Sequence, residues 1–137
     1  MFLDYIQRMH TSRQTQDKRT EIAHISDQVL QIAKRTGFPL ILGAQINRDA
    51  GKEHGTAKVK KPALENLKEA GNLEEDANLV LSVFNLSREQ DPPDGASWGR
   101  EVELEIKALK NRDGEPNAKV ELIFDRYTGN IKDGSIL

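Results

Sequence analysis

Hydrophobic residues recur every three or four positions between residues 20 and 35, which is the spacing of an amphipathic helix with one buried face. The buried stripe is expected to consist of Ile22, Ile25, Val29 and Ile32. Gly37 stands where a left-handed residue commonly ends a helix, and Pro39 prevents its continuation. We therefore predict one helix that ends just before Gly37.

Two segments, residues 38–44 and 78–84, are apolar at nearly every position. This pattern is typical of central strands that are covered on both faces, as in a parallel sheet. Residues 102–108 and 120–124 instead alternate apolar with mostly charged positions, which predicts half-exposed antiparallel strands. The turn-forming residues 111–117 between them predict a hairpin loop.

The order of these elements predicts a single α/β layered domain over residues 1–137, with a mostly parallel sheet and an antiparallel strand pair at its C-terminal end. The chain opens on a short apolar strand that ends at Asp4, and a short helical piece is expected near residues 63–70. The β-α unit that usually opens such a fold is missing. Because this leaves a free sheet edge, we expect the isolated chain to self-associate.

Composition excludes several classes of function. The 137 residues carry a net charge of -2 and contain no cysteine, so disulfides, thiolate zinc sites and cysteine nucleophiles are excluded. The apolar runs are far shorter than a membrane helix requires, and we expect a soluble, cytoplasmic protein with no membrane partner. The lysine-rich residues 52–61 fit a mobile basic loop or a phosphate-contacting loop, and charge alone favours the mobile loop.

The first candidate functional residues follow the ends of two predicted strands. Asp4 closes the first strand, and Gln45 follows the strand at residues 38–44, so both are expected at the carboxyl edge of a parallel sheet, where α/β folds bind nucleotides. Asp4 could position Mg²⁺, and Gln45 could orient water or sense a phosphate. For Asp4 the pattern alone favours an ordinary strand end. For Gln45 a solvated loop residue and a functional one are equally compatible with the pattern.

A second candidate is the pair Lys110 and Arg112 at the mouth of the predicted hairpin. Residues two apart on an extended backbone point to the same side, so both could engage one phosphate cluster. From the spacing alone, a solvated turn is the more common explanation for such a pair. The three histidines have no ligand-like spacing, and the chain contains no Gly-x-x-x-x-Gly-Lys-Ser/Thr phosphate loop.

Taken together, four ordered segments resemble the C-terminal half of the RecA-like ATPase domain of DnaB-family replicative DNA helicases. Residues 2–7 (F-L-D-Y-I-Q) are similar to that family's Walker B segment, I-D-Y-L-Q, and residues 44–48 (A-Q-I-N-R) to its sensor segment, S-Q-L-N-R. Residues 62–81 follow the pattern P-x-L-x-D-L-R-E-S-G-x-I-E-Q-D-A-D-x-V, and residues 110–114 (K-N-R-D-G) follow K-x-R-x-G.

The resemblance implies roles for the open candidates. Asp4 would be the Walker B aspartate, close to Mg²⁺ through water, and Gln45 the sensor that links nucleotide state to the DNA-binding loops. Lys110 and Arg112 would reach the ATP of the neighbouring subunit in a homo-oligomeric ring. ATP and Mg²⁺ would be the cofactors of the complete parent protein.

The resemblance also implies a contact with single-stranded DNA through Lys68, Glu69 and Gly71, which match the family's R-E-S-G loop. This chain departs from the pattern there, because lysine replaces arginine at position 68 and loses the planar fork that binds phosphate in two places. Other departures include Asn66, Ala70 and Asn78, which replace aspartate, serine and aspartate.

The P-loop and the catalytic glutamate of the family lie upstream of the matched region. We therefore expect this chain by itself not to hydrolyse ATP and to need no cofactor. The predicted function is that of a fragment of a hexameric helicase motor. The alternative is a stand-alone, non-catalytic helicase remnant that binds DNA or interferes with intact rings, and a weaker alternative is a fragment of a related RecA-like recombinase or repair ATPase.

Overall fold

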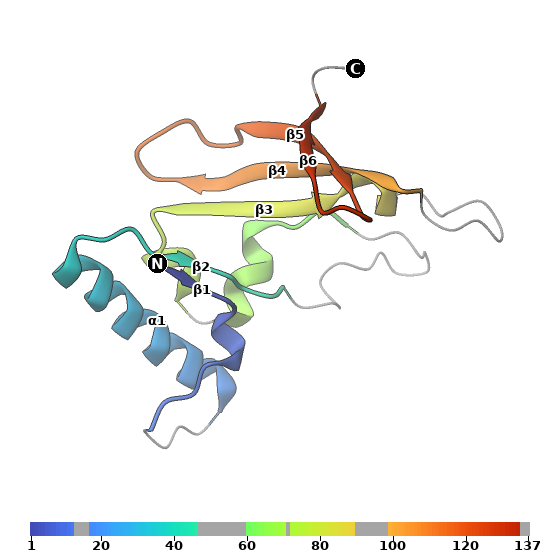
Figure 1. Ribbon diagram of the computed structural model, residues 1–137. Helices are drawn as coiled ribbons and strands as arrows, with labels where there is room; N and C mark the ends of the chain where they lie inside the picture. Colours follow the sequence, from blue (N-terminus) through green and yellow to red (C-terminus); the bar gives the residue numbers. More distant parts are fainter. Residues whose placement is uncertain (13–16, 47–59, 71, 90–98, 135–137) are drawn as a thin grey trace. The chain divides into compact units, whose positions relative to one another are not determined.

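The computed structural model describes residues 1–12, 17–46, 60–70, 72–89 and 99–134 (Figure 1). The chain forms two compact units. The first consists of Met1–Asn47 and Leu64–Ala77, and the second of Arg48–Ala63 and Asn78–Leu137. No helix within the described ranges is long and apolar enough to cross a membrane.

The first unit contains one parallel strand pair and one long helix. In chain order its elements are β1 (Phe2–Leu3), η1 (Ile6–Arg8), α1 (Lys18–Thr36), β2 (Ile41–Leu42), η3 (Leu64–Ala70) and α2 (Leu73–Asp76). Strands β1 and β2 pair in parallel, with Phe2 opposite Ile41 and Leu3 opposite Leu42. The predicted opening strand and the helical piece near residues 63–70 are both confirmed.

Helix α1 forms where the sequence predicts it. Asp17 caps its start, because the Asp17 carboxylate accepts a hydrogen bond of 2.8 Å from the Thr20 N–H. Gly37 ends it in the left-handed conformation, with φ 67°. The buried stripe packs into a core cluster formed by Ile6, Ile22, Ile25, Val29 and Leu73. Ile32, expected on the same stripe, is 45% exposed, because the cluster reaches only as far as Val29 along the helix.

The expectation that residues 38–44 form a strand covered on both faces is wrong. Only Ile41–Leu42 is regular strand, and the Phe38 and Ile41 side chains are exposed. Leu40 and Leu42 do pack against the core cluster of the first unit. The difference arises because, within the described ranges, β2 has a single partner strand, β1, and one face of this pair meets the core.

The second unit is an antiparallel sheet with the strand order β3-β4-β5-β6. Its elements are β3 (Leu79–Asn85), η4 (Leu86–Glu89), β4 (Glu101–Asn111), β5 (Lys119–Asp125) and β6 (Ile131–Asp133). The half-exposed pair β4 and β5 and the hairpin loop between them are confirmed.

Two expectations about the sheet are wrong for the described residues. Strand β3 was expected to be central and buried, but it lies at the edge of the sheet and pairs only with β4. Its buried side chains are Ser82 and Phe84, whereas Leu79, Leu81 and Val83 are exposed. The sheet is also not mostly parallel: two strands pair in parallel, and four form the antiparallel sheet, including the unpredicted β6. The predicted basic loop at residues 52–61 lies outside the described residues except for its last two positions.

Candidate functional site

Asp4 lies at the carboxyl edge of the β1–β2 pair, beside Gly43 of the next strand segment. The Gly43 N–H donates to the Leu3 carbonyl at 2.8 Å, and the Ile6 N–H donates to the Gly43 carbonyl at 3.0 Å, so the two segments stay paired past the end of β2. A Cβ atom at Gly43 would come within 3.1 Å of Asp4 Oδ1. Glycine at this position therefore leaves room beside the Asp4 carboxylate.

Gln45 lies at the same edge, two residues after Gly43. The Gln7 side-chain amide contacts the backbone of Gln45 twice: Gln7 Nε2 donates to the Gln45 carbonyl at 2.7 Å, and the Gln45 N–H donates to Gln7 Oε1 at 3.1 Å. The structure thus brings Asp4 and Gln45 to one sheet edge, as the sequence predicted. It adds Gln7, which sequence reasoning did not select although Gln7 closes the Walker B-like segment.

The side chains of Asp4 and Gln45 are exposed and make no hydrogen bond or ion pair with any residue that the structure describes. A carboxylate oxygen free of partners fits Mg²⁺, which takes oxygen ligands and keeps much of its water shell. Within the described ranges there is no group of three or more histidine or acidic side chains that could hold a metal ion. Asp4 therefore fits a water-mediated contact better than a closed protein cage.

The predicted DNA-contacting residues fall on and after η3 of the first unit. Lys68 and Glu69 lie within η3, and Gly71 lies outside the described residues. Helix α2 follows directly and is tied to α1, because the buried Ser26 hydroxyl donates a hydrogen bond of 2.5 Å to the Asp76 carboxylate. The segment after the predicted DNA loop is thereby attached to the longest helix of the unit.

Lys110 and Arg112 belong to the second unit, at the end of β4 and in the loop that follows. Lys110 is half-buried opposite Val80 of β3, and the Arg112 side chain is exposed. Arg112 contacts Asn78 twice: its backbone N–H donates to the Asn78 carbonyl at 2.9 Å, and its Nη1 donates to Asn78 Oδ1 at 3.0 Å. This contact places Arg112 beside Asn78, the residue just before β3 at which the sequence departs from the family pattern.

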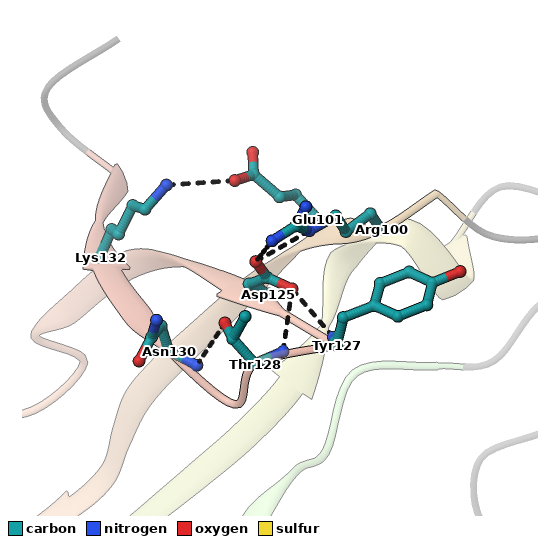
Figure 2. Close-up of polar contacts among 7 residues, drawn as sticks. All are labelled: Arg100, Glu101, Asp125, Tyr127, Thr128, Asn130 and Lys132. Carbon is teal, nitrogen blue, oxygen red and sulfur yellow. Dashed lines mark hydrogen bonds and ion pairs between the residues drawn. The ribbon is translucent and has the colours of Figure 1, made fainter.

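A cluster around Asp125 was not predicted (Figure 2). Asp125, only 6% exposed, accepts hydrogen bonds from Arg100 Nε at 2.9 Å and Nη2 at 2.6 Å, and from the backbone N–H groups of Tyr127 and Thr128 at 2.9 and 3.2 Å. The Arg100 guanidinium, followed by the two N–H donors, holds the pKa of the Asp125 carboxyl well below its usual range. The cluster fixes the turn between β5 and β6. Its sequence signal was the turn-forming stretch at residues 125–130.

One lysine of the basic stretch has a structural partner. Lys61 Nζ lies 3.0 Å from Glu105 Oε2, and the Glu105 side chain is buried on β4. A buried carboxylate needs such a partner, because burial of an unpaired charge is costly. Lys61 therefore compensates the charge of a buried carboxylate in the sheet of the second unit.

Comparison with known proteins matches nearly the whole chain to replicative DNA helicases. The sequence model of the family described as DnaB-like helicase C terminal domain matches residues 1–133. The replicative DNA helicase DnaB of Leifsonia xyli subsp. xyli is 30% identical over 134 residues, which cover 97% of this chain and 27% of the relative. A probable plasmid replicative DNA helicase of Chlamydia psittaci is 31% identical over 94% of this chain and 26% of the relative.

The solved structures contain a similar fold. One of them, an ATPase domain, superposes with a TM-score of 0.78 at 23% identity, covering 96% of this chain and 43% of that one. The chain spans about a quarter of the length of the two helicases named above. Because the family model covers nearly all of the sequence, the chain belongs to the DnaB-like helicase C-terminal domain family.

Proposed function

We propose that this chain is the C-terminal part of the ATPase motor of a ring-shaped replicative DNA helicase, which couples ATP hydrolysis to movement along single-stranded DNA and to unwinding of the duplex. The observation that carries the proposal is the family match over residues 1–133, together with the arrangement of Asp4 and Gln45 at one sheet edge. The relatives of similar sequence are named replicative DNA helicases.

The first unit would supply the part of the active site that acts within one subunit. Asp4 would hold Mg²⁺ through its water shell, and the bound ion would offset the negative charge of the ATP phosphates. The exposed side-chain amide of Gln45, next along the same edge, would respond to the nucleotide state. Neither residue has to give up a contact with another described residue to do so, because neither side chain makes one.

The second unit would supply the part that acts on the neighbouring subunit. Lys110 and Arg112 would stabilise the charge that develops on the transferred phosphoryl group of the adjacent ATP. Asn78 would help to position the Arg112 guanidinium, since Asn78 Oδ1 accepts a hydrogen bond of 3.0 Å from Arg112 Nη1. An aspartate, which the family pattern has at this position, would form an ion pair there.

The segment that contains Lys68, Glu69 and Gly71 would contact the backbone of single-stranded DNA. Phosphate contacts do not read sequence, so binding should be tolerant of sequence and dependent on salt. Replacing Lys68 with alanine in the complete polypeptide should reduce the slope of log affinity against log salt by about 0.7, the value for one phosphate contact on a single strand. Lys34→Ala, an exposed lysine of α1, is the matched control.

The motor is tested by ATP turnover of the complete polypeptide that carries this sequence. The proposal expects turnover that requires Mg²⁺, rises with single-stranded DNA and accompanies strand separation, and it expects no turnover from residues 1–137 alone. Turnover by residues 1–137 alone would contradict the division of the site.

A second candidate function, that of a non-catalytic helicase remnant, is favoured by one observation: these 137 residues contain no P-loop sequence. A stand-alone helicase remnant would bind DNA weakly or would enter intact rings and block them, with no catalysis of its own. A filter-binding assay of residues 1–137 with labelled single-stranded DNA over a salt series separates a DNA-binding remnant from an inert one. Loss of helicase activity when the chain is added to intact rings would support interference.

A further inference from the structure

Gln7 makes a contact that the proposed roles of the other residues do not use. Its side-chain amide meets both backbone groups of Gln45, as donor at 2.7 Å and as acceptor at 3.1 Å. A primary amide carries one donor group and one acceptor group side by side, so it can pair with a peptide backbone as a neighbouring strand would. Asp and Glu lack the donor, and Lys lacks the acceptor.

This contact begins where strand pairing stops. The last backbone hydrogen bond between the two segments joins the Ile6 N–H to the Gly43 carbonyl at 3.0 Å. Strand β2 itself ends at Leu42. The Gln7 side chain therefore extends the pairing by one further step and fixes the backbone of Gln45 beyond the strand.

Gln7 lies on a segment that is anchored in the core of the first unit. Gln7 follows Ile6, which is fully buried in the core cluster of the first unit. Both residues belong to η1, which closes with the Met9 N–H donating to the Ile6 carbonyl at 3.0 Å. Gln7 is thus attached to the core and to the Asp4 segment, three residues away, while its amide holds the residue proposed as the sensor.

We propose that Gln7 is a positioning residue that sets the backbone of Gln45 and thereby aims the Gln45 side chain along the edge occupied by Asp4. The inference rests on the proposed function of Gln45 as the sensor. Because Gln7 and Asp4 share one short segment, a shift of that segment with nucleotide state would move Gln45 as well. The measurable consequence is the coupling between DNA binding and ATP turnover.

The test measures ATP turnover of the complete polypeptide with and without single-stranded DNA, and the readout is the ratio of the two rates. Gln7→Met keeps the length of the side chain and removes both hydrogen bonds, and it should lower this ratio about tenfold, as expected for the loss of about 1.4 kcal/mol from two neutral hydrogen bonds. Gln7→Glu keeps the acceptor, loses the donor and sets a carboxylate against the Gln45 carbonyl, so it should lower the ratio as well. Gln28→Met, an exposed glutamine of α1, should leave the ratio unchanged.

Gln45→Ala separates the two claims. If Gln45→Ala lowers the ratio and Gln7→Met lowers it to a similar level, with no further loss in the double variant, the positioning role is supported. If Gln45→Ala lowers the ratio and neither Gln7 variant does, the positioning role is overturned and the sensor role stands. If Gln45→Ala leaves the ratio unchanged, the sensor role fails, and the positioning inference fails with it. A loss of thermal stability in both Gln7 variants with an unchanged ratio would show a purely structural contact and would also overturn the inference.

Discussion

Asn78 holds Arg112 at two points, through a backbone hydrogen bond of 2.9 Å and a side-chain hydrogen bond of 3.0 Å. The pair joins the start of β3 to the loop after β4, so the position of the arginine depends on the sheet of the second unit. Arg112 is one of the two cations proposed to reach the ATP of the neighbouring subunit. We therefore expect the loss of Arg112 to affect the nucleotide site of the neighbouring subunit.

Arg112→Ala in the complete polypeptide should lower ATP turnover by about a thousandfold while nucleotide binding is retained, because the arginine would act on the transition state of the neighbouring site. Arg112→Lys should recover little of the rate, since lysine lacks the planar fork. Arg35→Ala, an exposed arginine in the last turn of α1, is the matched control. Steady-state turnover and a nucleotide-binding titration measure the two quantities, and a variant ring that retains turnover would refute the assignment.

Asp4→Asn should abolish Mg²⁺-dependent turnover and leave the melting temperature of the protein nearly unchanged. The carboxylate makes no hydrogen bond or ion pair with the described residues, so its loss should not weaken the fold. Thermal unfolding and turnover measured on the same preparation test this separation. A substantial drop in melting temperature would show instead that Asp4 is a structural residue.

Among the residues that the structure describes, β3 pairs on one side only, and this edge predicts self-association of residues 1–137. Leu79, Leu81 and Val83 are 50, 55 and 62% exposed on this edge strand, and such an edge can pair with another chain. Val83→Lys should shift the chain toward monomer, because a lysine on an edge strand opposes pairing. Sedimentation at micromolar concentration measures the effect, with Val120→Lys on the interior strand β5 as the control. A wild-type chain that sediments only as a monomer would contradict the prediction.

Asp125 predicts that the second unit loses stability in acid. The folded protein holds the pKa of Asp125 below the usual value of 3.8, mainly through Arg100, so the unfolded chain takes up the proton first. The stabilisation is therefore complete above about pH 5 and is lost progressively as the pH falls from there toward the lowered pKa of the folded protein. Asp125→Asn should lower the stability at pH 7 and flatten its dependence on pH below about 5. Urea unfolding at several pH values tests this, with the exposed Asp113→Asn as the control.

The core of the first unit supplies a matched pair of substitutions on one helix. Ile25 is 3% exposed in the core cluster, whereas Ile32, seven residues later, is 45% exposed. Ile25→Ala should lower the free energy of unfolding by about 2–4 kcal/mol, and Ile32→Ala by less than about 1 kcal/mol. Chemical denaturation of the two variants measures the difference. Equal losses of unfolding free energy in the two variants would show that Ile32 is as buried as Ile25, contrary to the structure.

The sequence predicted the elements that local chemistry decides. Helix α1 was predictable because Gly37 and the three- to four-residue spacing act within the helix itself, and the β4–β5 hairpin because turn-forming residues separate two alternating strands. The common location of Asp4 and Gln45 at one sheet edge was also predictable, since the carboxyl ends of paired parallel strands lie at the same edge.

The remaining features depend on tertiary partners. An apolar run such as β3 has the pattern of a strand that is covered on both faces. Whether another strand or layer covers it depends on chain segments far away in sequence. Ser26 with Asp76, Gln7 with Gln45, and Arg100 with Asp125 are likewise long-range pairs, separated by 50, 38 and 25 residues. No local pattern marks such pairs, although Gln7 lay within a segment that already resembled the family motif.

The proposed function requires that these residues form one part of an ATPase motor whose phosphate-binding loop lies elsewhere in the same polypeptide. The intact mass of the native polypeptide that carries this sequence in its source cells tests this requirement. We expect a mass several times the 15.4 kDa of these 137 residues, since the chain spans about a quarter of the length of the helicases that it resembles. A mass close to 15.4 kDa would contradict the motor and would favour a non-catalytic binding or interfering protein.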